Sequence, residues 1–348
     1  MDLETARALW APEPGWLNTA SHGLPPTPAY EAVLAAQRDW RAGQGSWEAW
    51  SEEADKARAG FADLVGVSAS DVSIGANVSG MFAPVGVSFA PGTRVVLPDI
   101  EFTSNVYPWK VHEARGVEVV GVPLGKLASA IDERTDVVAY SLVQSSDGSI
   151  ADDAEIVAAA RAHGAMVVVD GTQAAGWLPV DATRYDVFAV GGYKWLMGPR
   201  GTAYAYYAPG VREQFVPVAA GWYAAEDVHG SYYGMDMRLA KDARRFDTAP
   251  ALFAWVGAPA ALDLVRAIGV EQIRAHDVAL ANRFLTALGQ PAGGSAIVTV
   301  DAPGAEEALR SAGVRAAVRA GRVRASFHVY STEADVDMAV EALRALRL

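Results

Sequence analysis

One lysine in a glycine-rich turn is the residue of this chain that most clearly suits covalent chemistry. Lys194 lies between two apolar, β-rich runs in the segment DVFAVGGYKWLMGPRGTAYAYY. The glycines on both sides of it indicate a backbone that bends tightly or approaches a ligand closely. A lysine side chain often extends along apolar surface to solvent, and this alternative stays open. A desolvated lysine amine, however, can form a Schiff base.

An aspartate at the end of a predicted strand supplies a second reactive group. The apolar run Met166–Asp170 predicts a strand buried on both faces, and Gln173 follows in the next turn. Ligands of open α/β sheets bind at the carboxyl ends of strands, where a buried carboxylate needs a cation. A helix N-cap is the alternative role for Asp170. An acid followed by a lysine in this order suits pyridoxal phosphate (PLP), which needs an amine and an acid for its pyridine nitrogen.

The segments DGTQAAG and GGYKWLMGPRG resemble those of class-V aminotransferase-fold proteins. This PLP-dependent group includes cysteine desulfurases, kynureninases and isopenicillin-N-epimerase-like proteins. The resemblance extends from WLNTASHGLPP to VRASFHVYSTEADVD and so covers nearly the whole chain. It implies an α/β protein of PLP-dependent transferase fold type I. Such a protein has a large domain with a mainly parallel sheet of the seven-stranded type and a small C-terminal α+β domain.

The resemblance implies a role for each matching residue around the cofactor ring. Lys194 would form the internal aldimine and then move the substrate Cα proton. Asp170 would pair with the pyridine nitrogen, and Gln173 would hydrogen-bond the ring hydroxyl oxygen. Phe102 would stack on the ring, although plain core packing explains an aromatic residue there equally well.

A phosphate site is implied at the helix start within IGANVSGMF. Backbone N–H groups at a helix N-terminus suit an anion, and Val78 and Ser79 match that position, with the Ser79 hydroxyl as a further donor. Tyr193 would reach the same phosphate. Thr248 lies in a segment that resembles the family's crossing of the dimer interface toward the partner's phosphate, which implies a homodimer with shared sites.

An arginine near the C-terminus matches the residue that holds the substrate α-carboxylate. A planar guanidinium binds a carboxylate with two hydrogen bonds, and Arg324 occupies the matching position. Arg322 shares its strand face by the period of two and is the rival. His22 and Gln144 match positions near the substrate and the cofactor hydroxyl, yet each could equally be a turn residue.

The chain departs from the desulfurases in one decisive respect. It contains no cysteine, which excludes disulfides, cysteine metal ligands and a cysteine nucleophile. The segment AAVRAGRVRAS also predicts two strands joined directly, without room for the loop that carries the desulfurase cysteine. Trp47 and Trp50 either line the pocket or, more simply, pack in the core. We predict no metal site and no persulfide-forming desulfurase activity.

Alternating strand and helix patterns predict the scaffold that positions these residues. The predicted elements of the large region are strands at Arg94–Leu97, Val117–Val122, Val137–Val143, Met166–Asp170, Val187–Val190 and Ala203–Tyr207, and helices at Pro28–Arg41, Glu52–Val65 and Asp152–His163. A helical stretch over Ala251–Leu288 follows, and then strands in SAIVTVDA, VRAAV and RVRASFHVY with helices at Ala305–Ser311 and Glu333–Leu346. This pattern predicts an N-terminal arm (1–20), a PLP-binding domain (21–250), and a linking helix with a small domain (251–348).

Composition narrows the class of protein. The net charge is −12 and the basic residues form no long cluster, which disfavours nucleic-acid binding. No apolar run is long enough to predict a membrane span, and the N-terminus lacks the pattern of a signal peptide, so we expect a cytoplasmic protein.

Taken together, these features predict a PLP-dependent enzyme acting on a small amino acid or a similar metabolite. Transamination ranks first because it needs only the groups named above. Elimination, including C–S lysis, ranks second, and epimerisation third. A PLP-fold protein that binds a ligand without turnover is the non-enzymatic alternative, and the presence of Lys194, Asp170 and Arg324 disfavours it.

Overall fold

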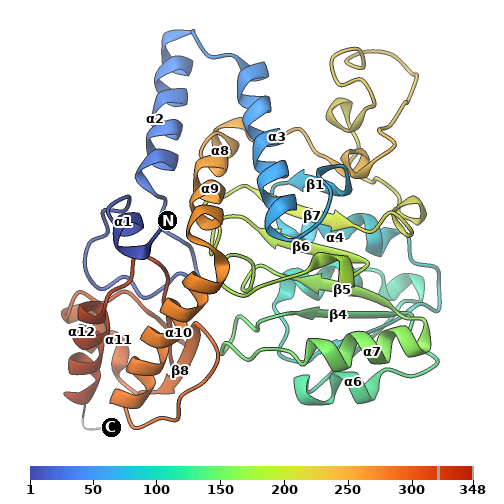
Figure 1. Cartoon of the computed structure of the whole chain (residues 1–348). Helices are drawn as coiled ribbons and strands as arrows, with labels where there is room; N and C mark the ends of the chain where they lie inside the picture. The colour runs from blue at the N-terminus through green and yellow to red at the C-terminus, as the bar shows by residue number, and fades with distance from the viewer. Residues whose placement is uncertain (320–321, 347–348) are drawn as a thin grey trace.

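The computed structural model describes residues 1–319 and 322–346, and a seven-stranded sheet forms its centre (Figure 1). The strand order is β1-β7-β6-β5-β4-β2-β3, and all neighbours from β6 to β3 run parallel. β7 is antiparallel to both of its neighbours. The strands are β1 (Val72–Gly75), β2 (Arg94–Pro98), β3 (Glu118–Val122), β4 (Val137–Ser141), β5 (Met166–Asp170), β6 (Val187–Gly191) and β7 (Ala203–Tyr207). The predicted mainly parallel sheet is therefore confirmed, and β1 is an addition to the prediction.

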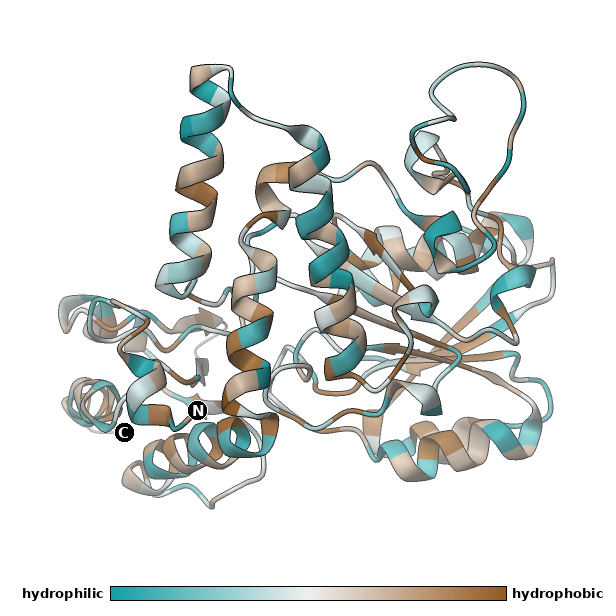
Figure 2. Cartoon of the chain, turned by 45° about the horizontal axis from the view of Figure 1, so that its top comes forward, coloured by the Kyte–Doolittle hydropathy of each residue, from teal (hydrophilic) through white to brown (hydrophobic). Residues whose placement is uncertain are grey.

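Helices cover both faces of this sheet, which explains why its strands are apolar almost throughout. The helices are α1 (Leu3–Arg7), α2 (Thr27–Ala42), α3 (Trp47–Leu64), α4 (Val78–Val87), α5 (Tyr107–Lys110), α6 (Leu127–Ala130), α7 (Asp153–His163), α8 (Leu252–Trp255), α9 (Ala258–Ile268), α10 (Val270–Ala287), α11 (Ala305–Ser311) and α12 (Glu333–Arg344). In Figure 2 the central strands are mainly brown, while the helices show mixed brown and teal surfaces, as amphipathic helices do.

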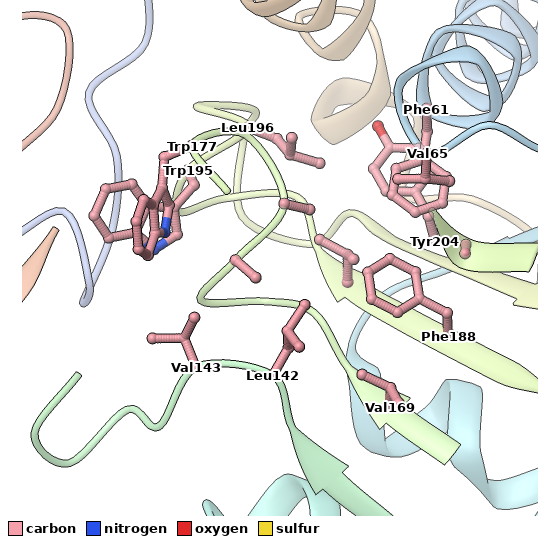
Figure 3. Close-up of a cluster of buried hydrophobic side chains, with 14 of the residues drawn as sticks. Phe61, Val65, Leu142, Val143, Val169, Trp177, Phe188, Trp195, Leu196 and Tyr204 are labelled. Carbon is pink, nitrogen blue, oxygen red and sulfur yellow. The ribbon is translucent and has the colours of Figure 1, made fainter. Parts of the chain in front are cut away.

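Alternate residues of each central strand belong to different cores. Val167 and Val169 of β5 pack in the core that also contains residues of α3, α7 and α9. Val168, between them, packs in the core formed with α4 and α5. Figure 3 shows part of the first core, where Phe61 of α3 lies against Tyr204 of β7 with ring centroids 4.6 Å apart. This two-sided burial holds the strand ends, and hence the site residues, in fixed positions.

The long helical stretch predicted over Ala251–Leu288 is interrupted, so that prediction was wrong in its continuity. Three helices, α8, α9 and α10, occupy it, and the axis bends by 83° between α9 and α10. Gly269 at this bend has φ +92°, a conformation that favours glycine. The bend directs α10 toward the C-terminal part of the chain.

The C-terminal part of the chain contains a three-stranded antiparallel sheet in the order β8-β10-β9. Together with α10, α11 and α12, this sheet forms a third core. Its strands are β8 (Ile297–Asp301), β9 (Ala317–Arg319) and β10 (Arg322–Ser326). Leu17 of the N-terminal segment belongs to this core, and Asn18 forms a parallel bridge with Ser326. The arm predicted over residues 1–20 thus packs on the C-terminal unit. The exact division at 20/21 and 250/251 stays a prediction.

No single helix within residues 1–319 and 322–346 has the length and apolar composition to cross a membrane. The segments Leu252–Ile268 and Val270–Ala287 reach that length and composition only when they are joined across their 83° bend.

Candidate active site

A cavity opens at the carboxyl ends of the central strands, where ligands of open α/β sheets bind. It gathers residues from the ends of β4, β5 and β6, the start of α4 and the loop after β2. Its lining residues are Asn77, Val78, Phe102, Ser104, Ser141, Ser145, Asp170, Thr172, Gln173, Gly191, Tyr193 and Lys194. Six residues singled out from the sequence are thus brought together: Val78, Phe102, Asp170, Gln173, Tyr193 and Lys194.

Lys194 lies in a tightly packed turn between β6 and β7. Met197 has φ 54°, which is unusual for a residue with a side chain, and its N–H donates to the Lys194 carbonyl at 3.1 Å. A Cβ on Gly23 would lie 2.0 Å from the same carbonyl oxygen, so only glycine fits there. Lys194 is 7% exposed, and its Nζ lies 5.5 Å from the centre of the Phe102 ring. The alternative of a lysine extending to solvent is excluded.

Asp170 ends β5 and is almost fully buried. Its Oδ1 accepts a hydrogen bond from the Thr172 N–H at 2.8 Å. It caps no helix, because the residues that follow it form turns. Burial raises the pKa of Asp170, while the Thr172 hydrogen bonds and the Lys194 charge act in the opposite direction. A buried carboxylate in this position favours a cationic partner in the cavity.

Gln173 is held by three hydrogen bonds. Its Nε2 donates to the Ala20 carbonyl at 3.0 Å and to the Ser145 hydroxyl at 2.9 Å, and its Oε1 accepts from Trp195 Nε1 at 2.8 Å. Both amide N–H groups are therefore already used. Its predicted contact with a cofactor oxygen would require one of these bonds to be exchanged, so that role stays a prediction.

Arg324, on β10, also hydrogen-bonds Ser145 of the cavity lining. Its Nη1 donates to the Ser145 carbonyl and, at 3.2 Å, to the Ser145 hydroxyl, while Nη2 donates to the Ser21 hydroxyl at 3.0 Å. Arg324 is 4% exposed, whereas the Arg322 side chain is half exposed and pairs with Asp301 at 3.0 Å. Depth along the strand thus separates the two arginines, and only Arg324 adjoins the cavity lining.

Ser145 was not singled out from the sequence, although its neighbour Gln144 was. Gln144 is fully buried and donates to Glu101 at 3.1 Å and to the Ser141 carbonyl at 3.4 Å. Ser145 lines the cavity, whereas Gln144 is not among the lining residues and donates to Glu101, so the substrate contact expected of Gln144 stays a prediction. The repeated hydroxyls of VQSSDG were the available signal.

Glu101 is a second residue that the sequence did not reveal. This buried carboxylate accepts hydrogen bonds from the N–H groups of Ser141 at 2.7 Å and Phe102 at 2.9 Å, and also from the Ser141 hydroxyl. Burial raises its pKa, and the hydrogen bonds from Ser141 and Gln144 oppose that effect. Glu101 thereby fixes the backbone of Phe102, whose ring forms one wall of the cavity.

The start of α4 has the features of an anion site. Asn77 caps the helix by accepting from the Gly80 N–H at 2.8 Å, and the Ser79 hydroxyl donates to the same Asn77 oxygen at 2.9 Å. Among the described residues, the N–H groups of Val78 and Ser79 donate to no protein acceptor. Two backbone donors thus remain for an anion, while the Ser79 hydroxyl is engaged with Asn77.

Thr248 lies beside this anion site in its own chain. Its N–H donates to the Ile74 carbonyl at 3.4 Å, at the end of β1. The preceding residue, Asp247, is buried and accepts hydrogen bonds from Nη2 and Nη1 of Arg58, at 2.7 and 3.1 Å. Asp247 also accepts from the Ser73 hydroxyl and the Ile74 N–H. This network fixes the segment carrying Thr248 to β1. A contact across a dimer stays a prediction.

Tyr193 lines the cavity and contacts both Lys194 and Arg200. Its ring centre is 5.9 Å from Lys194 Nζ and 4.8 Å from the Arg200 guanidinium carbon. Burial raises the pKa of Tyr193, so its hydroxyl remains a hydrogen-bond donor at neutral pH. His22 is exposed near Arg200 and packs on Trp16 with ring centroids 4.6 Å apart. It is not among the cavity-lining residues.

The two tryptophans considered as pocket residues lie elsewhere. Trp47 packs against Trp222 with ring centroids 5.7 Å apart, and Trp50 packs against Phe253 at 5.1 Å. Neither lines the cavity. Among the described parts of the chain, no group of three or more histidine, aspartate or glutamate side chains could hold a metal ion.

The sequence profile of the Aminotransferase class-V family matches residues 40–308, which is most of the chain. The chain belongs to this family. The prediction of a PLP-dependent protein of fold type I is confirmed, because PLP is the cofactor of this enzyme family.

Several characterised and uncharacterised relatives have recognisable sequence similarity. An uncharacterized aminotransferase of Bacillus subtilis, YcbU, is 32% identical over 241 residues, which cover 66% of this chain and 64% of that protein. The chain thus spans slightly less than two thirds of this relative. Isopenicillin N epimerase of Streptomyces clavuligerus is 30% identical over 99% of this chain and 98% of its own length. A probable cysteine desulfurase of Methanothermobacter thermautotrophicus is 28% identical over 75% of the chain and 69% of that protein.

Solved structures share the fold across nearly the whole chain. The cystine C–S lyase C-DES with its product cysteine persulfide has a TM-score of 0.85 at 23% identity, covering 95% of this chain and 97% of that one. The cysteine desulfurase CsdA of Escherichia coli has a TM-score of 0.84 at 20% identity, covering 100% and 98%. At these identities the likeness establishes the fold alone.

The residues present fit PLP. Asp170 offers a buried carboxylate for a pyridinium, and Lys194 lines the same cavity. The start of α4 offers two N–H donors for a phosphate, and the Phe102 ring forms a wall suited to an aromatic ring. The carboxylate, the amine, the aromatic ring and the two N–H donors thus suit the pyridine nitrogen, the aldehyde, the ring and the phosphate of the cofactor, respectively.

Proposed function

We propose that this chain is a PLP-dependent enzyme acting on a small amino acid or amino-acid-like metabolite, most simply an aminotransferase. The convergence of Lys194, Asp170 and Arg324 supports the proposal. Lys194 and Asp170 line one cavity, and Arg324 is hydrogen-bonded to Ser145 of the same lining. The family and its named relatives include aminotransferase, desulfurase and epimerase members, which are compatible with this chemistry.

When bound, PLP supplies an aldehyde that captures amines and a ring that accepts the electron pair released at a substrate Cα. Lys194 would hold the cofactor through its amine and then carry a proton to or from Cα. Asp170 would keep the pyridine nitrogen protonated, since its burial leaves it in need of a cation. Phe102 would hold the ring plane, and Tyr193 together with the N–H groups of Val78 and Ser79 would bind the phosphate.

Substrate orientation falls to Arg324 and its partners. Its guanidinium would bind the α-carboxylate with two hydrogen bonds, exchanging its present contacts with Ser145 and Ser21 for the substrate. Ser145 also accepts from Gln173, so carboxylate binding would be communicated to the residue beside the cofactor hydroxyl. The low exposure of Arg324 and Lys194 excludes water from both ends of the substrate.

Transamination ranks first because the groups at the cavity suffice for it. It needs one group that moves a proton between the substrate Cα and the cofactor carbon, and Lys194 would be that group. C–S lysis or another β-elimination is the second candidate and epimerisation the third. The epimerase alternative has a specific basis, namely the full-length similarity to isopenicillin N epimerase.

We further propose a homodimer. The Arg58–Asp247 network holds the segment containing Thr248 beside the anion site. The resemblance implies a partner subunit at this surface. The loop that precedes this segment exposes almost all of Tyr233 and Met235 and most of Met237. Such exposure of apolar side chains is typical of interfaces.

Covalent labelling tests the cofactor assignment directly. The PLP-loaded protein is reduced with borohydride, digested, and the pyridoxyl-labelled peptide is mapped. We expect the label on Lys194, its loss in Lys194→Ala, and its retention in the matched control Lys126→Ala, whose side chain is exposed. Label on any other lysine in the unmodified protein would contradict the assignment.

A substrate screen then tests the reaction type. Amino acids are incubated with keto-acid acceptors, and keto acid, ammonia, sulfide and enantiomeric ratio are measured. New keto acid with amino transfer supports the aminotransferase, whereas ammonia with pyruvate moves the lyase ahead and loss of optical purity moves the epimerase ahead. Absence of turnover together with tight PLP binding would favour the ligand-binding alternative.

Cysteine as substrate separates elimination from persulfide transfer. A thiolate nucleophile is required for persulfide formation, and the chain has none. Only two residues lie between the end of β9 and the start of β10, although this connection itself is outside the described residues. We expect pyruvate and ammonia, if cysteine is turned over. Stoichiometric alanine with sulfur release would overturn this expectation.

A further inference from the structure

A buried chain of polar groups connects the Lys194 turn to the C-terminal unit and to the N-terminal helix. His328, which follows β10, is fully buried, and its Nε2 lies 3.0 Å from the Trp195 carbonyl oxygen. Its Nδ1 lies 3.0 Å from Asp277 Oδ2 on α10. The other Asp277 oxygen lies 2.8 Å from His276 Nδ1, and His276 Nε2 contacts the Arg7 guanidinium of α1.

The chemistry of the partners determines where the protons lie. Arg7 can only donate, so His276 Nε2 accepts and His276 Nδ1 carries the proton that it gives to Asp277. The Trp195 carbonyl can only accept, so His328 Nε2 carries a proton. The second ring nitrogen faces a carboxylate oxygen, and two lone pairs would repel at 3.0 Å. A proton therefore lies on this contact too, shared between His328 Nδ1 and Asp277 Oδ2, and the Nε2–H of His328 is the donor to the Trp195 carbonyl.

The location of His328 relates two proposed site residues. Trp195 directly follows Lys194, and His328 lies four residues after Arg324. One hydrogen bond thus joins the turn that carries the lysine to the strand that carries the arginine. The Trp195 ring reinforces the link, because it packs on the His328 ring with centroids 5.3 Å apart and donates to Gln173.

We propose that His328 is a positioning residue: held by Asp277 through its Nδ1, it donates from Nε2 to the Trp195 carbonyl and fixes the Lys194 turn relative to Arg324. The biological purpose of this role rests on the proposed function, whereas its physical test does not. His328 and Trp195 are both fully buried, so loss of this hydrogen bond would leave a buried carbonyl without a partner, which is costly.

Several groups hold the His328 ring in place. Asp277 is in direct contact, and Arg7 and His276 approach Asp277 from its far side. The Tyr330 ring lies with its centroid 5.5 Å from that of His328, and Lys194 precedes the residue whose carbonyl is bound. His328 is also held through its backbone, because its N–H donates to Ser331 at 3.1 Å and its carbonyl accepts from Ser331.

The hydrogen-bonding role of the ring is tested first, in the full chain without added PLP. Side-chain 15N spectra of the six histidines are recorded at pH 7.5, and His328→Gln identifies the signal of His328. We expect a proton on His328 Nε2, because the Trp195 carbonyl can only accept a hydrogen bond. A His328 ring with an unprotonated Nε2 in the unmodified protein would overturn the proposal.

Positioning is tested by hydrogen exchange at the turn. The reporter is the Met197 N–H, which donates to the Lys194 carbonyl. His328→Phe keeps a ring but removes both ring nitrogens, and we expect exchange at this amide to accelerate about tenfold or more, because the buried hydrogen bond to the Trp195 carbonyl is lost. His328→Gln retains a donor for the Trp195 carbonyl and should stay within a few-fold of the unmodified protein. The exposed His163→Gln is the matched control and should change nothing.

The outcomes separate this inference from the proposed function. Unchanged Met197 exchange in His328→Phe, or equal acceleration in His328→Gln and His328→Phe, would refute the positioning role. If His328→Phe fails to fold, the 15N spectrum of the unmodified protein decides, because an unprotonated His328 Nε2 could not donate to the Trp195 carbonyl. A failure of PLP to label Lys194 would refute the proposed function and leave these measurements unaffected.

Discussion

The Arg58–Asp247 pair is the interaction whose loss should destabilise this protein most clearly. Asp247 is 1% exposed and accepts four hydrogen bonds, two from Arg58, one from the Ser73 hydroxyl and one from the Ile74 N–H. Arg58 is 4% exposed and also donates to the Val72 carbonyl. Both charges are thus withdrawn from water. Arg58 also pairs with the exposed Asp55 at 3.2 Å, whereas the buried Asp247 is compensated by Arg58.

Asp247→Asn keeps the size of the side chain and removes its charge. If the amide oxygen keeps the Ile74 N–H, the amide nitrogen must face the Arg58 guanidinium, where two donors oppose each other. Breaking a buried ion pair by changing one partner typically costs about 3–5 kcal/mol. Since natural proteins are stable by about 5–15 kcal/mol in total, the loss should be large and easily measured.

The assay is urea unfolding of the PLP-free protein, followed by fluorescence and circular dichroism at constant pH. Asp63→Asn is the matched control, because its ion pair with Arg266 is exposed on both sides and should contribute at most about 1 kcal/mol. A double replacement, Arg58→Met with Asp247→Leu, should recover much of the loss, since no uncompensated charge remains.

The reasoning would be refuted if Asp247→Asn lowered the unfolding free energy no more than Asp63→Asn. It would be weakened in a different way if the double replacement were less stable than Asp247→Asn alone. That result would mean that shape, and not charge compensation, determines the contribution of the pair.

Four further outcomes follow from the structure. Asp170→Asn should retain the fold and PLP binding but lose nearly all turnover, because a neutral amide cannot keep the pyridine nitrogen protonated; turnover similar to the unmodified protein, with PLP bound, would contradict this role. Burial, and then the charge of Arg200, lowers the pKa of His22 from its ordinary value of 6.5, so protonation of His22 costs stability as the pH falls below that value. Arg200→Gln should therefore move the His22 titration, followed by proton NMR, upward toward 6.5, and an unchanged titration would disprove the Arg200 effect. Light scattering should give a homodimer, and Thr248→Ala should weaken PLP binding several-fold if its hydroxyl contacts phosphate; a fully active monomer would contradict the shared site.

Local sequence patterns determined most of the large sheet. The apolar runs of β5 and β7 were predicted with their observed bounds, because strands buried on both faces are apolar at every position. The four-residue β1 was not predicted, since Val72–Gly75 is too short to show a period and includes a serine and a glycine. Its place beside β7 depends on a pairing between segments far apart in the chain.

The same limit applies to the candidate site. Asp170 and Lys194 could be identified from the sequence, because each ends or follows a recognisable strand at the edge where ligands bind. The choice of Arg324 over Arg322, and of Ser145 over Gln144, depended on side-chain depth and direction, which neighbouring residues on a strand or turn do not reveal.

Only the tertiary structure brought together groups that are distant in sequence. Glu101 meets Ser141, Asp247 meets Arg58, and His328 meets Asp277 and Trp195. Taken singly, these residues have no pattern that distinguishes a buried, paired group from a solvated one. The sequence by itself determined the cofactor chemistry, because that requires only residue types at strand ends. Packing decided which polar groups hold those strand ends in place, because a buried charge is stable only beside its partner.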